Sequence, residues 1–429
     1  MKKIYWLLLS GLIPFLLSAQ TGHIMQGVGA VNMSMGGAST AQPIDINGAL
    51  QWNPATITHF NRNTFSANAG FFFSSPELRS TVPTSEQPVS GITRDARGMS
   101  VMPSLAMVWG SPQSRHRFGV SAFGISGFGV TFPENMNNPI NMPQNYGGFG
   151  RVQSDYQLMQ VGFTYAYKVS EKFSVGLAPT FNYSSLKLLP NPIASPNQEK
   201  GYPKSDRATA FGLGGQAGIF YQPGAGFKLG VSYKTTQYFD AFRFRNHYLD
   251  HSKAPDVSFR MNYPSILSAG VGYSRKNIDL AIDYRYVNYS HTEGFEKQGW
   301  TETASVKGFG WRDISIVSAG LQYKGVSHLP LRVGYTYSSN PIRGDLAFFS
   351  VPATAIIKNA FQVGVGYELS ERFVVNTTYH HGTSSGSTSG PLLSPMMVSE
   401  SNPTGAIPGS LVSYKMTTDL FLIGVDIRF

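Results

Sequence analysis

The chain ends in a stretch whose side chains alternate strictly in character. In LFLIGVDIRF, residues 420–429, one face carries Phe421, Ile423, Val425, Ile427 and Phe429. The other face carries Leu422, Gly424, Asp426 and Arg428. Successive side chains of a β-strand point to opposite faces, and charges confined to one face are typical of a strand that faces lipid on the other. This stretch is therefore predicted to be a membrane strand of a β-barrel.

The same alternation recurs along the chain and predicts fourteen strands. Their ranges are 64–73, 103–109, 117–132, 155–167, 173–185, 209–221, 227–236, 265–274, 277–288, 313–323, 330–339, 358–368, 372–381 and 416–429. The connections are short after every even strand, as in KVSEK, and long after every odd strand, as in Ser75 to Met102. Outer-membrane barrels have tight periplasmic turns and long external loops, and an even strand count leaves both termini on the periplasmic side.

Aromatic residues gather at one end of the predicted hairpins. Even strands end in Trp109, Tyr167, Tyr221, Tyr273, Tyr323, Tyr367 and Phe429, and odd strands begin with Phe118, Phe173, Phe227 and Phe373. Amphipathic rings favour the membrane–water interface, whereas a soluble β-sandwich gives no reason for such a gathering. The sequence thus predicts an all-β fold, a 14-stranded antiparallel transmembrane β-barrel.

The N-terminus has the layout of a signal peptide that covers residues 1–19. Lys2 and Lys3 precede a short apolar stretch, which ends at the small-residue site Leu17-Ser18-Ala19. The stretch is too short to be a comfortable membrane anchor. We therefore expect export, and with the barrel pattern we expect the outer membrane of a Gram-negative bacterium.

Composition agrees with a barrel and excludes several other classes. Only 14% of the residues are charged and 13% are aromatic, whereas soluble domains have about 25% charged residues. The net charge of +10 falls to +8 without Lys2 and Lys3, and it is spread without a basic run or helix. Nucleic-acid binding is therefore not expected. The chain has no cysteine, so disulfides and thiolate metal sites are excluded.

Residues 20–63 precede the first predicted strand and lack the membrane-strand pattern. Their apolar residues favour burial; these are Ile24, Met25, Val28, Val31, Met33, Met35, Leu50, Trp52, Ile57 and Phe60. Fourteen strands enclose a lumen too wide for wall side chains alone to fill. We therefore predict a signal peptide at 1–19, a plug or hatch at 20–63 inside the lumen, and a transmembrane barrel at 64–429.

The predicted hatch resembles a known family. GVGA at 27–30, GGA at 36–38 and NGALQWNPATITHFNRNTFSANAGFFF at 47–73 are similar to the hatch and first strand of the FadL/TodX family. Members of that family are outer-membrane transporters of long-chain fatty acids and other hydrophobic compounds. Asn53-Pro54-Ala55 matches the family's hatch motif, so the resemblance implies that these residues belong to the gate. The resemblance continues in order through KFSVGLAPTFNYSSLKL, and beyond it only strand number and layout match.

The third predicted strand, RFGVSAFGISGFGVTF, changes face. Its apolar residues lie at even positions from Phe118, at odd positions for Phe123 and Ile125, and again at even positions from Phe128. A regular strand cannot change face without an extra residue, so we predict a β-bulge. Glycines that would help are Gly124, Gly127 and Gly129. The alternative is a glycine-rich strand that curves with the wall. In the family the third strand opens the wall sideways, so these glycines and Phe128 are the expected lateral opening.

The resemblance also implies a passive transport route. An apolar ligand would be captured among external loops, pass into a lumenal pocket and leave sideways when the hatch moves, because it gains by avoiding water. Loop residues suited to capture are Phe132, Met136, Ile140, Met142, Tyr146 and Phe149; packing of the loops on one another is the alternative. Inward-facing cations that could meet a carboxylate are Arg285, Arg332, Lys228 and Lys234. The alternative is that they pair with lumenal acids such as Asp279, Asp283 and Glu368.

No motif predicts an enzyme, a cofactor or a metal site. His247 and His251 have metal-binding spacing only if they lie on a helix, and they fall in a predicted loop. No Gly-x-Ser-x-Gly elbow occurs, so a lipid hydrolase is not expected. We predict a gated transporter of hydrophobic small molecules that works as a monomer among outer-membrane lipids. The alternatives are a general porin and a FadL-like barrel that serves as an attachment or assembly partner of exported proteins.

Overall fold

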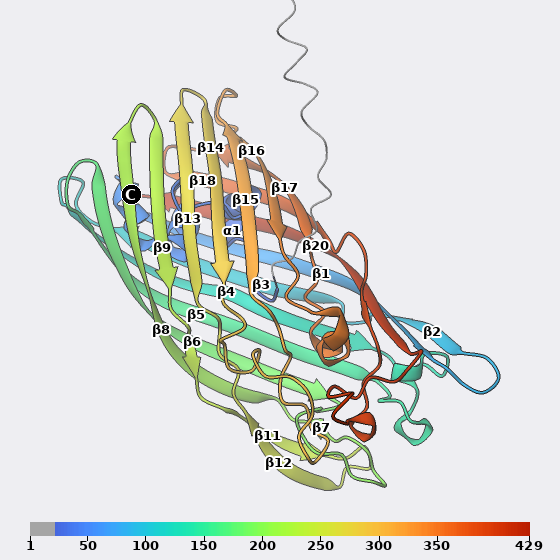
Figure 1. Ribbon diagram of the computed structural model, residues 1–429. Helices are drawn as coiled ribbons and strands as arrows, with labels where there is room; N and C mark the ends of the chain where they lie inside the picture. Colours follow the sequence, from blue (N-terminus) through green and yellow to red (C-terminus); the bar gives the residue numbers. More distant parts are fainter. Residues whose placement is uncertain (1–21) are drawn as a thin grey trace, which may run out of the picture.

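The computed structural model describes residues 22–429, and the predicted signal peptide lies outside the described residues. Fourteen antiparallel strands form one closed barrel around a short helical segment (Figure 1). The predicted fold class is therefore confirmed. Within residues 22–429, every helix is too short or too polar to cross a membrane.

The barrel strands follow one another in chain order around the ring. They are β1 (Thr64–Val82), β3 (Met99–Trp109), β4 (His116–Phe132), β5 (Val152–Lys168), β6 (Phe173–Leu189), β8 (Ala208–Gly224), β9 (Phe227–Lys234), β13 (Ile266–Arg275), β14 (Ile278–Val287), β15 (Ile314–Tyr323), β16 (Leu331–Ser338), β17 (Asn359–Glu368), β18 (Phe373–Thr383) and β20 (Leu411–Arg428). The ring closes where β20 pairs with β1, from Thr64↔Arg428 to Thr81↔Leu411. We call the end with the short connections the turn end and the opposite end the loop end.

The wall shows the alternation that the sequence predicts. On β14, Leu280 and Ile282 are exposed on the outer face, whereas Asp283 and Arg285 are buried toward the lumen. Aromatic side chains exposed at the turn end include Trp109, Phe118, Tyr221, Phe227, Tyr323, Tyr367, Phe373 and Phe429. Apolar outer positions and a polar, filled interior are what a lipid-facing barrel requires.

The first and last strands are longer than predicted. β1 extends to Val82 and β20 begins at Leu411, because the two strands continue to pair beyond the stretch with apolar alternation. Short strands also join the sheet, namely β2 (Val89–Arg94), β10 (Tyr238–Phe239) and β19 (Thr388–Gly390). A separate small sheet at the loop end contains β7 (Lys204–Ser205), β11 (Phe242–His247) and β12 (Lys253–Phe259) (Figure 1). The 3-10 helices of the loops are η2 (Pro139–Asn141), η3 (Gln144–Tyr146), η4 (Gly344–Ala353) and η5 (Pro395–Met397).

The segment before β1 forms the hatch, which comprises α1 (Gly29–Ser34), α2 (Ile46–Trp52) and the 3-10 helix η1 (Pro54–His59). α1 contacts β16, β17, β18 and β20, whereas η1 contacts β4, β5, β6 and β8, so the hatch reaches opposite parts of the wall. Asp45 caps α2 by accepting hydrogen bonds from the amides of Asn47 and Gly48. Burial, and secondarily the nearby charge of Asp426, raise the pKa of Asp45 to about 7.

Candidate functional site

Strands β3 and β4 separate part of the way along the wall. Their pairing stops at Ser104↔Phe123. Beyond that point β3 stays beside β1, and β4 stays beside β5 as far as Phe132. The register of β4 against β5 shifts between Gly124 and Ser126, where the sequence predicts a bulge. Each strand is therefore left with an unpaired edge toward the other.

The bulge also decides which way the apolar side chains of β4 point. Phe118 is 41% exposed on the outer face, whereas Phe123 and Ile125 are buried. After the bulge Phe128 is buried as well, so the second half of β4 contributes its large side chains to the interior rather than to lipid. Gly127 is exposed, and Gly129 is half-buried.

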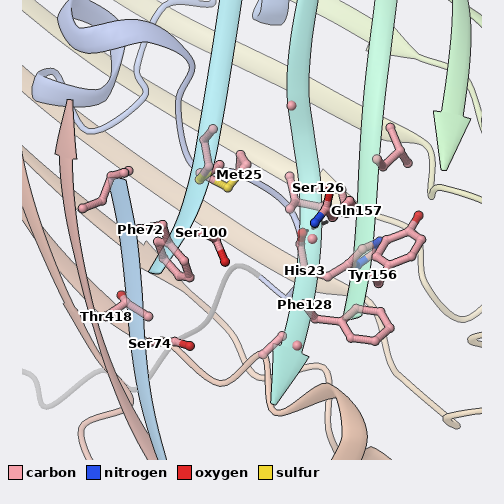
Figure 2. A pocket seen from close by; sticks show the side chains of 18 of the residues that line it. His23, Met25, Phe72, Ser74, Ser100, Ser126, Phe128, Tyr156, Gln157 and Thr418 are labelled. Carbon is pink, nitrogen blue, oxygen red and sulfur yellow. Dashed lines mark hydrogen bonds between the residues drawn. The ribbon is translucent and has the colours of Figure 1, made fainter. Parts of the chain in front are cut away.

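A cavity of about 290 Å³ occupies the gap between the separated strands. Its lumenal side is lined largely by apolar side chains, including Met25, Met33, Phe72, Met102, Leu158 and Leu420. Figure 2 shows Phe72 and Ser74 on β1 across the cavity from Phe128 and Tyr156. The lining also includes Val101, which is 58% exposed on the outer face, and Gly127. The cavity therefore reaches both faces of the wall.

The first described residues of the hatch close this gap from inside. Ile24 forms an isolated antiparallel bridge with Ser126. The Met25 amide donates to the Ile125 carbonyl at 3.0 Å, and the Gly127 amide donates to the His23 carbonyl at 3.2 Å. Residues 23–25 thus provide hydrogen bonds to backbone groups of β4 that would otherwise pair with β3.

His23 fixes this closing segment in a box of aromatic rings. Its Nδ1 lies 2.8 Å from the Tyr289 hydroxyl, and its ring stacks on Phe295 with centroids 4.8 Å apart. Tyr156 and Trp311 complete the box at 6.0 and 5.9 Å. Burial lowers the pKa of His23 to about 3, so the imidazole is neutral at physiological pH. His23 belongs to no sequence pattern that predicts a site, and its one local signal is its position just after the predicted signal peptide.

The Asn53-Pro54-Ala55 triplet attaches the hatch to the wall. The Asn53 amide nitrogen donates to the carbonyls of Thr40 at 2.8 Å and Ile219 on β8 at 2.9 Å, and its Oδ1 accepts from the Ala55 amide. A Cβ at Gly176 would lie 2.5 Å from the Pro54 carbonyl carbon. Glycine on the wall therefore allows the close approach.

Replacing Asn53 with alanine is expected to loosen this attachment. The Thr40 and Ile219 carbonyls would lose a buried donor, and each unsatisfied group costs about 1–3 kcal/mol. The free energy of local opening of residues 40–59, measured by hydrogen exchange, should fall by that order. Pro54→Ala is the control because it keeps all the Asn53 bonds, and unchanged exchange in Asn53→Ala would contradict the assigned role.

A buried ion pair on β14 forms a second attachment. Asp283 Oδ2 accepts from the amides of Ser39 and Thr40, both at 2.8 Å, and from Arg285 at 2.7 Å. Arg285 also donates to the Gly37 carbonyl at 2.6 Å and lies 3.7 Å from the ring centroid of Trp52. The pair is almost fully buried, so Arg285 is committed to the hatch.

The other predicted cations are likewise engaged away from the cavity. Lys228 donates to Gln42 of the hatch at 3.0 Å, and Lys234 donates to Gln160 at 3.0 Å. Arg332 donates to Gln322 at 2.6 Å and to Asn376 at 3.1 Å. The structure therefore does not bring the four predicted cations together into one carboxylate site, and only Arg285 pairs with a lumenal acid among those expected.

The predicted capture residues divide into two groups. Met136 and Tyr146 are exposed, and Met142 is half-buried, whereas Phe132 and Ile140 are buried in the core. Phe149 packs on Tyr202 and Phe348. Ile140 and Phe149 line a small apolar cleft of about 50 Å³ at the loop end, together with Tyr202, Trp300, Phe348 and Phe349.

Histidines that are close in the sequence, His247 with His251 and His380 with His381, have surroundings other than a metal site. His247 ends β11 and His251 lies in the following turn. On β18, His380 is buried against Gln362, whereas the partly exposed His381 lies 2.9 Å from Asp419. Across residues 22–429 the structure has no group of three or more His, Cys, Asp or Glu that could hold a metal ion.

Comparison with known proteins gives sequence relatives. A family model described as outer membrane protein transport protein (OMPP1/FadL/TodX) matches residues 21–389. The chain is similar to the long-chain fatty acid transport protein of Escherichia coli O6:H1, with 24% identity over 387 residues, covering 79% of this chain and 82% of the relative. A protein of the same description from Salmonella typhi is 23% identical over 383 residues, with the same coverage.

Solved structures give the same fold. The toluene transporter TodX of Pseudomonas putida superposes with a TM-score of 0.69 at 16% identity, covering 94% of this chain and 99% of that one. A FadL homologue of Pseudomonas aeruginosa superposes with a TM-score of 0.72 at 13% identity, covering 95% of this chain and 100% of that one. At these identities the likeness concerns the fold.

Proposed function

The chain belongs to the outer membrane protein transport protein (OMPP1/FadL/TodX) family, and from this premise we propose that it carries hydrophobic small molecules, long-chain fatty acids foremost, across the outer membrane. The membership makes it a transport protein rather than an enzyme. Support for the ligand class comes from the two sequence relatives, which are long-chain fatty acid transport proteins. A solved neighbour transports toluene, another apolar molecule.

The cavity that passes through the wall is the observation that carries the proposal. It joins an apolar lumenal surface to the outer face between β3 and β4, at Gly124, Gly127, Phe128 and Gly129. In this route a ligand enters at the loop-end cleft beside Ile140 and Phe149 and leaves sideways into the membrane. An apolar solute gains by never entering the aqueous periplasm. A general porin is disfavoured because the hatch fills the lumen.

The gate in this proposal is the hatch. Residues 23–25 close the wall opening, and Asn53, Pro54 and Ala55 hold the hatch to β6 and β8. Movement of residues 23–25 away from β4 would open the lumen to the cavity, and through the cavity to the membrane. We further propose that the turn end, where the C-terminus lies, faces the periplasm, whereas the first described residues of the hatch lie inside the barrel beside Ser126 of β4. We also propose that the domain division falls between hatch and barrel at residue 63, and that the protein works as a monomer.

A reversible crosslink tests the gate. Ile24 and Ser126 form a non-hydrogen-bonded antiparallel pair, in which Cα atoms lie about 4.5 Å apart, a distance that a disulfide accepts. The chain has no cysteine of its own. The variant with Ile24→Cys and Ser126→Cys is therefore expected to lose uptake of radiolabelled palmitate when oxidised and to regain it after reduction.

The matched control is Ile24→Cys alone, which loses the same side chain but cannot crosslink. Its uptake should be insensitive to oxidant. Undiminished uptake by the fully crosslinked protein would show that the ligand does not need residues 23–25 to move.

A further inference from the structure

The cavity in the wall has a single charged side chain among its described lining residues. Apart from Arg97, its polar lining consists of neutral groups such as Ser74, Ser100, Ser126, Gln157 and Thr418, together with two buried histidines. An apolar ligand without a headgroup has neither a charge nor a hydrogen-bond acceptor that could interact with a guanidinium at this place. The position of Arg97 is therefore informative about the ligand.

Arg97 lies at the outer mouth of the opening. It belongs to the connection between β2 and β3, and its guanidinium extends over Gly129 of β4, where a Cβ would collide with it. Its Nη2 donates to Asp155 Oδ1 on β5 at 2.8 Å, and the other carboxylate oxygen of Asp155 accepts from Arg207. Asp155 is the one ion-pair partner of Arg97 among residues 22–429, so N–H groups of a five-donor side chain stay available.

The surroundings of Arg97 are cationic and lie near the membrane interface. Lys187 is the cross-strand partner of Asp155, so three cations, Arg97, Lys187 and Arg207, gather around Asp155, and with Asp95 as the second nearby carboxylate they still outnumber the acids. Farther down the same outer face the exposed rings of Tyr183 and Phe211 pack 5.5 Å apart. Lys187 is four residues beyond Tyr183, which is about 13 Å along a strand. Aromatic rings mark the interface, and Arg97 lies on the loop-end side of these rings, toward the polar side of the interface.

We propose that Arg97 binds the carboxylate of an amphipathic ligand whose hydrocarbon chain occupies the wall cavity. This inference rests on the proposed transport function and deepens it, because it selects anionic amphiphiles over neutral hydrocarbons. A bare carboxylate in hydrocarbon is strongly disfavoured, whereas the arginine fork matches a carboxylate with two hydrogen bonds. The headgroup can thus stay at the interface while the chain moves sideways through the wall.

The test compares ligands that differ only in the headgroup. Palmitate and hexadecanol are titrated into the full protein in phosphatidylcholine nanodiscs at alkaline pH, where the acid is ionised. Arg97→Gln should weaken palmitate binding about tenfold to a hundredfold, the range for a hydrogen bond to a charged group, and leave hexadecanol binding unchanged. Arg97→Lys should restore most of the palmitate affinity. Arg207→Gln is the charge-matched control: it also removes a cation beside Asp155, but Arg207 does not line the cavity, so the loss of palmitate affinity should be much smaller than for Arg97→Gln.

Each outcome has a defined meaning. Equal losses for the acid and the alcohol, or no loss for the acid, would overturn the assignment of Arg97. Lipopolysaccharide added to the nanodiscs should leave palmitate affinity unchanged; displacement of palmitate that depends on Arg97 would assign this residue to a lipid phosphate instead and overturn the proposal. A wild-type protein that binds neither ligand would contradict the proposed function itself.

Discussion

Removal of residues 22–59 is expected to convert the closed barrel into an open, water-filled pore. The hatch fills the ring of fourteen strands, and wall side chains alone do not fill a lumen of that width. Single-channel recordings in planar bilayers should show little steady current for the full protein and a stable open level for the deletion variant. Cells that produce the variant should also become sensitive to hydrophilic antibiotics too large for their own porins.

A point variant separates the effect of losing the plug from misfolding of the deletion variant. Asp283→Ala keeps every residue of the hatch but leaves the amides of Ser39 and Thr40 and the buried Arg285 without their shared acceptor. Removing one partner of a buried pair costs about 3–5 kcal/mol, so this variant should show frequent brief openings. A well-folded deletion variant without added conductance would mean that the lumen closes by other means.

The wall of this protein is predictable because its two faces impose opposite demands. Lipid requires apolar side chains at one set of alternate positions, and the filled lumen requires small or polar ones at the other, as β14 shows with Ile282 outside and Asp283 inside. The β-bulge in β4 could be predicted from the sequence for the same reason, because Phe123 and Ile125 depart from the alternation. The strand extensions toward Val82 and from Leu411 lie where this constraint no longer applies.

The contacts of the site depend on how hatch and wall are aligned, which no local pattern encodes. Arg285 could be predicted to face inward. Its contacts with Gly37 and Trp52, however, depend on how the hatch is placed against β14. Apolar residues at a strand end or in a loop, such as Phe132 and Ile140, look the same in the sequence whether the fold exposes or buries them. Glycines at inward positions, such as Gly176, were a usable signal because they mark where another backbone approaches.

Acid is expected to release the closing segment at the wall opening. The pKa of His23 is lowered by burial from 6.5 to about 3, so the closed state binds fewer protons than the open one between these values. The contribution of neutral His23 to the stability of the closed state is therefore complete above pH 6.5. It is lost progressively as the pH falls toward 3, by about 1.4 kcal/mol per pH unit. Protection factors of the Met25 and Gly127 amides, which hold the segment to β4, should fall along this course.

The comparison with His23→Phe isolates the imidazole. Phenylalanine retains the aromatic contacts but cannot be protonated, so the protection factors of this variant should lack the acid-dependent decline.

Asp45, another titrating group of the hatch, acts in the opposite sense. Its pKa, raised to about 7, stabilises the hatch at low pH, and this stabilisation is lost as the pH rises past that value. His59, whose pKa burial lowers to about 4, acts in the same sense as His23. Asp45 and His59 are present in both proteins, so their contributions cancel when the two proteins are compared. An equal acid-dependent decline of the protection factors in the wild-type protein and in His23→Phe would show that the responsible proton binds elsewhere than on His23.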